Sequence, residues 1–162
     1  MGRVEVSARG SFPPERFVAA LTDFGAERSR IWGNSTPGLF EVHDLREHSA
    51  DVTEGTRHGG VWQRYHCDWA KPGLVRLDVV DSNTFGPGSY WEYRVTADAA
   101  GGCEVRLPIN RAPSTARGKV FDHVLRLIGR PYFTRDLRRT LRRIERADRR
   151  GERDGPGSAA GR

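Results

Sequence analysis

The sequence has few cysteines and no long apolar segment. Its 162 residues include two cysteines, Cys67 and Cys103, which are too few for a disulfide framework, although a single bridge between them stays open. No apolar run reaches the roughly eighteen residues of a membrane-spanning helix, and the N-terminal segment has no apolar signal-peptide core. These absences predict a cytoplasmic protein.

Signals of common catalytic and metal sites are also weak. The 5 histidines show no metal-binding spacing, and no glycine-rich phosphate loop opens a helix. His66, Cys67 and Asp68 are consecutive, so on a strand their side chains alternate between the two faces and cannot form a site alone. We therefore expect no metal and no cofactor, and the sequence identifies no catalytic residue.

Positive charge is concentrated at the C-terminal end. Residues 1–115 hold 13 Lys and Arg against 15 Asp and Glu, a net charge of −2, whereas residues 116–162 hold 14 against 6, a net charge of +8. Such a block can bind nucleic acid or anionic lipid. The simpler interpretation is a solvated helix face whose arginine stems cover apolar surface. No aromatic residues alternate with these arginines, so specific nucleic-acid binding is not expected.

The chain length fits one domain, which we place over residues 1–150. The segment Ser11-Phe12-Pro13-Pro14-Glu15 begins a helix that ends near Phe24, because proline is tolerated in a first turn and glutamate suits the positive end of the helix dipole. A second short helix is expected over about 26–32. Turn-forming glycines and prolines separate the predicted strands, which are 3–9, 39–47, 50–55, 61–70, 74–82, 89–97 and 103–110. The small, polar segment 151–162 is expected to be disordered.

The rest of the chain is predicted to pack around a last long helix, from Thr115 to about Ala147. Its apolar residues recur at helical spacing and form one stripe: Phe121, Val124, Leu125, Ile128, Tyr132, Leu137, Leu141 and Ile144. Arginines occupy the opposite face: Arg135, Arg138, Arg139, Arg142, Arg143 and Arg146. Gly129 and Pro131 interrupt the pattern, which predicts a kink or, alternatively, two separate helices.

Seven strands with mostly short connections predict an antiparallel sheet that curls over one long helix, an α+β domain. This order resembles the helix-grip fold of the START and birch-pollen-allergen superfamily, also called SRPBCC. The segment from Phe12 to Phe24, FPPERFVAALTDF, is similar to the AP-x-x-V-W-x-x-L-T-D-F opening of its polyketide cyclase/dehydrase branch, and Trp32 lies where that branch often has a tryptophan. The resemblance covers about residues 3–147 and implies a cavity between the sheet and the last helix.

Alternation along the strands predicts the wall of such a cavity. The strand 61–70 is ambiguous, and we turn Tyr65 inward because this choice leaves Arg64, His66 and Asp68 in water. The inward residues are then Val61, Gln63, Tyr65, Cys67 and Trp69, followed by Val75, Leu77, Val79 and Asp81, by Trp91, Tyr93 and Val95, and by Cys103, Val105, Leu107 and Ile109.

The predicted ligand-binding residues are mostly apolar or aromatic, with a few polar groups, as in small-molecule sites. They are Trp32, Gln63, Tyr65, Trp69, Val79, Asp81, Trp91, Tyr93, Val105 and His123. Asp81 is the most informative, because an inward carboxylate must lie at the cavity mouth or meet a base such as Arg111. Phe85 and the helix that carries Trp32 are expected to narrow the entrance. The same aromatic rings also fit a solid core without a cavity.

We therefore expect binding of a hydrophobic or aromatic small molecule, lipid-like or polyketide-like, by a monomer or homodimer. The resemblance implies an alternative, a polyketide aromatase or cyclase that acts on a poly-ketone in the same cavity. A second alternative is binding of nucleic acid or an anionic membrane by the arginine-rich helix.

Overall fold

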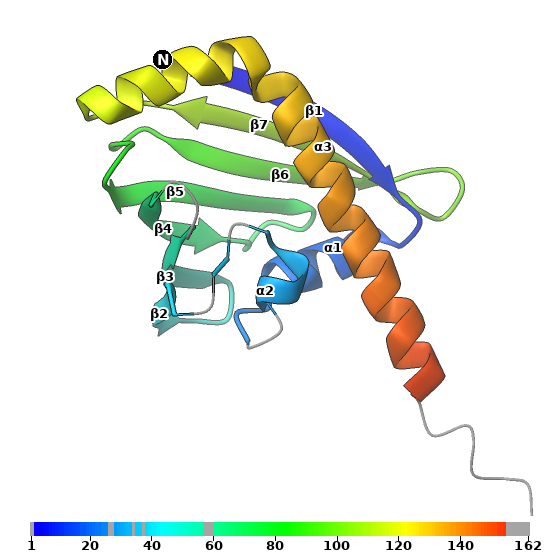
Figure 1. The fold of residues 1–162 in the computed structure, drawn as a ribbon. Helices are drawn as coiled ribbons and strands as arrows, with labels where there is room; N and C mark the ends of the chain where they lie inside the picture. Colours follow the sequence, from blue (N-terminus) through cyan, green and yellow to red (C-terminus); the bar gives the residue numbers. More distant parts are fainter. Residues whose placement is uncertain (1, 26–27, 34, 37, 57–59, 155–162) are drawn as a thin grey trace, which may run out of the picture.

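The computed structural model describes residues 2–25, 28–33, 35–36, 38–56 and 60–154, which form one curved sheet with its helices on one side (Figure 1). The antiparallel strands follow the order β1-β7-β6-β5-β4-β3-β2. The strands are β1 (Gly2–Gly10), β2 (Phe40–Leu45), β3 (Ser49–Gly55), β4 (Trp62–Asp68), β5 (Leu74–Ser82), β6 (Tyr90–Ala97) and β7 (Cys103–Arg111). The helices are α1 (Pro14–Leu21), α2 (Arg28–Ile31) and α3 (Ala116–Asp154). The predicted seven-stranded helix-grip architecture is confirmed.

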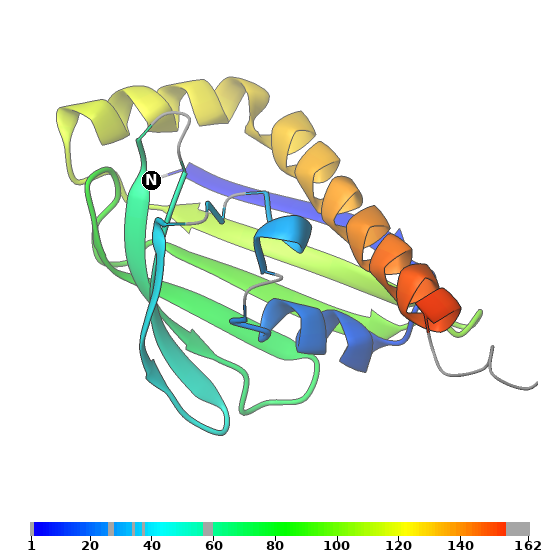
Figure 2. The same cartoon turned by 60° about the horizontal axis from the view of Figure 1, so that its bottom comes forward.

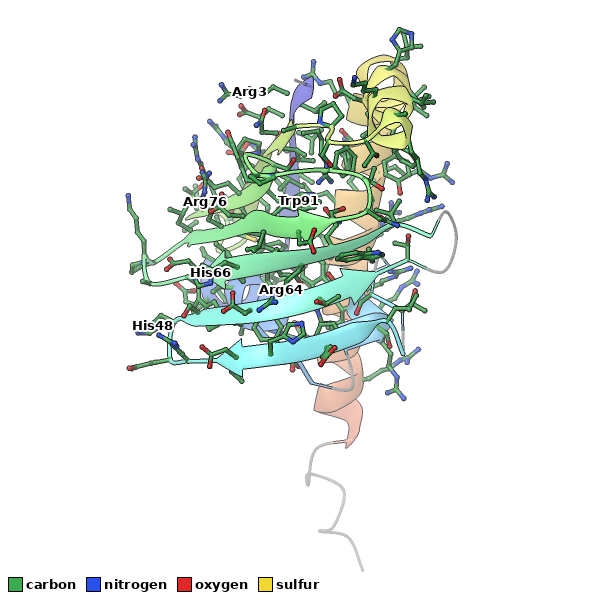
Figure 3. All side chains as sticks on the ribbon, turned by 90° about the vertical axis from the view of Figure 1, so that its left-hand side faces the viewer. Arg3, His48, Arg64, His66, Arg76 and Trp91 are labelled. Atoms are coloured by element: carbon green, nitrogen blue, oxygen red, sulfur yellow. The ribbon has the colours of Figure 1, made fainter. Side chains whose placement is uncertain are left out.

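The two faces of the sheet differ as the alternation predicts. On β4, Tyr65 and Cys67 are buried, whereas Arg64 and His66 are exposed, so the inward face chosen for this strand is confirmed. Figure 3 looks onto the outer face, where Arg64, His66 and Arg76 lie. There Arg76 pairs with Asp78 and Glu92 at 2.8 and 3.0 Å. Charged pairs thus cover the side of the sheet that faces away from α3.

A β-bulge breaks the alternation near the end of β5. Tyr65 pairs with Val79, but the next residue back on β4, Arg64, pairs with Asp81, so Val80 has no partner of its own. Val79 is buried, while Val80 and Asp81 are both exposed. Because the extra residue shifts every later side chain to the other face, the predicted inward position of Asp81 is wrong.

Helices α1 and α2 cover one end of the inner face (Figure 2). Pro14 lies in the first turn of α1, and Phe17, Ala20 and Leu21 bury its inner side. Helix α2 is shorter than predicted, and positions 26–27 of the expected helix lie outside the described residues. Trp32 follows α2 and donates its indole N–H to the carbonyl of Ala20 over 3.0 Å, which fixes the ring against α1.

Helix α3 crosses the inner face and changes direction along its length (Figure 1). The Thr115 hydroxyl caps its first turn by accepting a hydrogen bond from the Gly118 N–H at 3.0 Å. Gly118 is required here, because a Cβ atom would clash with the carbonyl oxygen of Thr84. Pro131 lies inside a continuous helix, so the alternative of two separate helices is wrong. The helix also extends beyond the predicted end, and residues 155–162 of the expected tail lie outside the described residues.

The two halves of α3 are buried differently. In the C-terminal half, Leu137, Leu141 and Ile144 are at most 3% exposed and belong to the core. In the N-terminal half, Phe121, Val124, Ile128 and Tyr132 are 38–58% exposed. The predicted apolar stripe is therefore buried in its C-terminal part and exposed in its N-terminal part. The part up to Tyr132 leaves apolar side chains in contact with water.

Contacts outside the core also hold the C-terminal half more firmly. Arg16 of α1 bonds Asp148 through Nε at 2.7 Å, and Ser11 donates its hydroxyl to Glu145 at 2.8 Å. Arg143 donates from Nη1 to the carbonyl of Ile31 over 3.1 Å. The half of α3 that follows Pro131 is thus anchored to α1, α2 and the core.

Among the described residues, Cys67 and Cys103 are free buried thiols on β4 and β7, so the bridge left open by the sequence does not form. Burial raises the pKa of the Cys67 thiol to about 12. No described helix has both the length and the apolar content needed to cross a membrane. No cluster of three or more His, Cys, Asp or Glu in the described part of the chain is arranged to hold a metal ion.

Candidate functional site

A cavity of about 400 Å³ lies between the sheet and α3. Its sheet side includes Gln63 of β4, Trp91 and Tyr93 of β6, and Leu107 and Arg111 of β7. Its helix side is formed by Phe121, Val124, Leu125, Ile128, Tyr132, Phe133, Asp136, Leu137 and Thr140 of α3. Trp32, Thr56, Val61 and Phe85 complete the wall. The half-exposed residues of the N-terminal part of α3 are therefore lining residues of this cavity.

Arg111, the last residue of β7, is the buried cation of the cavity, with 7% of its surface exposed. Its guanidinium carbon lies 3.6 Å from the centroid of the Trp91 ring and 4.7 Å from that of Phe85. Nη1 donates a long hydrogen bond of 3.4 Å to Oε1 of Gln63, and Nε has no hydrogen-bond partner among the described residues. Aromatic rings therefore hold this cation where an acid would ordinarily pair with it.

Burial in the cavity shifts the acid–base behaviour of its polar groups. Desolvation lowers the pKa of Arg111 to about 9, against the opposing influence of Tyr93 and Tyr132. Desolvation likewise raises the pKa of the Tyr93 phenol, so this group stays neutral at physiological pH. Asp136 also lines the cavity but is exposed at the surface. Desolvation raises the pKa of its carboxyl, while Arg143 and Arg139 oppose this shift. The cavity thus offers a cation, a neutral phenol and a carboxyl group.

A second buried arginine, Arg28, is paired within the protein and does not line the cavity. It donates from Nε to Glu54 at 3.1 Å and from Nη2 to the Tyr65 hydroxyl at 3.2 Å, and that hydroxyl donates to Glu54 at 3.1 Å. The guanidinium also contacts the rings of Phe24 and Phe40. This closed network links α2 to β3 and β4.

The structure brings four of the predicted site residues together on the cavity wall: Trp32, Gln63, Trp91 and Tyr93. Tyr65 lies outside the lining because its hydroxyl belongs to the Arg28 network. Val79 and Val105 are buried in the sheet core, and Trp69 packs on Phe24 with ring centroids 5.9 Å apart. His123 is exposed on α3, and Asp81 is exposed beyond the bulge. These last six residues do not line the cavity.

Arg111 was predicted only as a partner for Asp81 and not as a site residue. The alternation on β7 contained the signal, because Cys103, Val105, Leu107 and Ile109 all face inward and Arg111 is the next residue in that series. The same reasoning on β3 places Glu54 with the buried Ala50 and Val52. Phe85, expected at the entrance, is buried and forms part of the wall.

Comparison with solved structures shows several proteins of the same fold at low sequence identity. An aromatase/cyclase from Streptomyces sp. R1128 superposes with a TM-score of 0.71 at 14% identity, over 96% of this chain and 98% of that chain. A START superfamily protein from Mycobacterium smegmatis gives 0.70 at 7% identity, over 91% and 99%. A STAR-related lipid transfer protein from Xanthomonas axonopodis gives 0.65 at 13% identity, over 88% and 85%.

No family model and no curated protein matches the sequence significantly. At identities this low, the structural likeness establishes the fold and leaves the activity open. The chain has the helix-grip fold shared by START superfamily proteins and polyketide aromatase/cyclases.

Proposed function

We propose that the chain binds a hydrophobic small molecule, lipid-like or polyketide-like, in the cavity between the sheet and α3. The main support is the unfilled space beneath the N-terminal half of α3. Phe121, Val124 and Ile128 face this space and remain 38–53% exposed, although they lie on the helix face directed at the sheet. A ligand would cover these side chains, and removal of apolar surface from water is the main driving force for such binding.

The size and lining of the cavity agree with this proposal. Its volume of about 400 Å³ falls within the range of roughly 300–1,000 Å³ that is typical of small-molecule sites. Other hollows on the described surface, such as the groove lined by Arg9, Arg138 and Glu145, are open and largely charged. The cavity under α3 is therefore the place where an apolar ligand gains most from leaving water.

A titration with decanol tests this proposal. Val124 lines the cavity and is 44% exposed, so Val124→Trp should fill the mouth without straining the core. Val120 lies one turn earlier on α3, is 66% exposed and does not line the cavity, so Val120→Trp is the matched control. We expect one decanol to bind per chain in calorimetry, with binding abolished by Val124→Trp and retained by Val120→Trp. Failure of the unmodified chain to bind either decanol or its carboxylate analogue decanoate would contradict the proposal.

A polyketide aromatase or cyclase is a second candidate, supported by the combination of Arg111, Tyr93 and Asp136 around one cavity. A carboxylate can remove a proton next to a ketone, and a cation and a phenol can stabilise the enolate that forms. Incubation with a linear poly-ketone thioester tests this activity by the absorbance of an aromatic product. Loss of turnover in Asp136→Asn with unchanged decanol binding would support catalysis. Absence of turnover in the unmodified chain would rule out this activity and leave ligand binding as the proposed function.

Binding of a polyanion by the arginine-rich face of α3 is the remaining alternative. Arg135, Arg138, Arg139, Arg142 and Arg146 are exposed there. Such a surface binds through charge alone, and its affinity for DNA or anionic vesicles should fall steeply with added salt. The cytoplasmic location and the monomeric or dimeric state stay predictions.

A further inference from the structure

Arg111 is a buried cation for which the described residues provide no acid partner. Only 7% of its surface is exposed, and its single hydrogen bond to a side chain of the described residues is the 3.4 Å contact with Gln63. Nε has no partner among these residues. Burying an unpaired charge is costly, so proteins rarely retain one without a compensating group.

The aromatic rings around Arg111 compensate for only part of this cost. Trp91 and Phe85 contact the guanidinium through their ring faces, at 3.6 and 4.7 Å. Ring contacts satisfy none of the N–H donors in the guanidinium plane, so Nη1, which bonds Gln63, is the one donor of Arg111 with a side-chain acceptor among the described residues. Arg28, by contrast, has Glu54 and Tyr65 as acceptors. The chain therefore supplies acceptors to Nε, Nη1 and Nη2 of Arg28, whereas Arg111, which lines the cavity, has one long hydrogen bond to a side chain of the described residues.

Apolar residues continue from Arg111 along the same cavity. Phe121, Leu125 and Ile128 of α3 line it together with Leu107 of β7. A ligand with a charged end on Arg111 therefore has apolar wall available for the rest of its length. A carboxylate matches the planar, two-pronged geometry of a guanidinium, with which it can form two parallel hydrogen bonds.

We propose that the ligand of this cavity is an amphipathic carboxylate, whose charged end pairs with Arg111 between Trp91 and Phe85 and whose apolar part lies against α3. This inference rests on the proposed function and specifies the class of ligand. In the bound state the carboxylate supplies the acceptors that Arg111 lacks in the free protein.

The test compares decanoate with decanol, which share the chain length and differ in charge. In calorimetry at neutral pH, we expect decanoate to bind the unmodified chain about tenfold more tightly or better, as expected for charge-assisted hydrogen bonds. Arg111→Gln should weaken decanoate by about the same factor and change decanol by less than about twofold. Arg135→Gln removes one exposed positive charge elsewhere on α3 and should leave both affinities unchanged.

Each other outcome has a distinct meaning. Equal affinities for decanoate and decanol would overturn the carboxylate inference and leave the proposed function standing. A preference for decanoate that Arg135→Gln removes as fully as Arg111→Gln would show attraction by general positive charge and would also overturn it. Failure of both compounds to bind would overturn the proposed function itself. If Arg111→Gln does not fold, equal affinities in the unmodified chain still overturn the inference, and a decanoate preference that Arg135→Gln leaves intact still supports it.

Discussion

Arg28 donates a hydrogen bond from Nε to Oε1 of Glu54 over 3.1 Å, and the two side chains are only 3% and 6% exposed. Burial lowers the pKa of Arg28, but the pairing with Glu54 raises it, and the net shift is upward. Burial instead dominates at Arg111, whose pKa falls to about 9. We therefore expect the same substitution at these two arginines to change the free energy of unfolding differently.

Arg28→Met should lower the free energy of unfolding by about 3–5 kcal/mol, because it leaves the Glu54 carboxylate buried without its cation. Arg111→Met should leave the free energy of unfolding unchanged or raise it, because an unpaired charge is replaced by an apolar side chain of similar length. Urea unfolding monitored by circular dichroism measures both values. An equal loss of stability in the two variants would show that Arg111 is a structural residue.

The two halves of α3 predict a second contrast. Leu141 is 2% exposed in the core, so Leu141→Ala should cost about 2–5 kcal/mol of unfolding free energy. Ile128 is 53% exposed at the cavity, so Ile128→Ala should cost less than about 1 kcal/mol and should weaken decanol binding. Urea unfolding and calorimetry on the same preparations check both statements. A large loss of stability in Ile128→Ala would mean that this half of α3 is packed against the sheet and does not line an unfilled cavity.

The charge of Arg111 predicts how binding of an anion depends on pH. Arg111 is charged below its pKa of about 9 and neutral above it, so the attraction for an anion is present at neutral pH and is lost as the pH rises through about 9. Decanesulfonate keeps its own charge over this range and is a suitable probe. We expect a constant affinity from about pH 6 to 8 and a fall above about pH 9.

Other ionisable groups near Arg111 define the controls for this titration. Burial raises the pKa of Tyr93 and of Tyr132, so both phenols remain neutral where Arg111 loses its charge. Asp136 of α3 lies at the cavity rim, and Asp122 of α3 lies across an adjoining pocket of about 130 Å³ that Arg111 also lines. Asp136→Asn should preserve the pH profile, whereas Arg111→Gln should flatten it. A profile that stays flat to about pH 10 in the unmodified chain would contradict the account.

Most of the fold was accessible from the sequence because each strand has one buried face. Alternation along β6 places Trp91 and Tyr93 inward, and the structure finds both on the cavity wall. The same rule failed at Asp81, since a bulge at Val80 depends on the pairing of β5 with β4. A pattern within one strand does not contain that information.

The candidate site was accessible only in part. Helical spacing identifies the apolar face of α3 but not what lies beneath it, so Leu141 and Ile128 look alike in the sequence and differ in the structure. The pairing of Arg28 with Glu54 joins residues from different elements, and no local pattern indicates it. Arg111 would have been found by extending the alternation of β7 to its last residue.

The central claim is that the cavity under α3 binds an apolar ligand, and the position of the ligand tests it most directly. Crystals grown with 10-bromodecanol would locate the bromine by its anomalous scattering. We predict one bromine site per chain inside the cavity, in contact with lining residues such as Trp91, Leu107 or Leu125. Bromine found only on the outer surface, with the cavity filled by side chains of α3, would contradict the account.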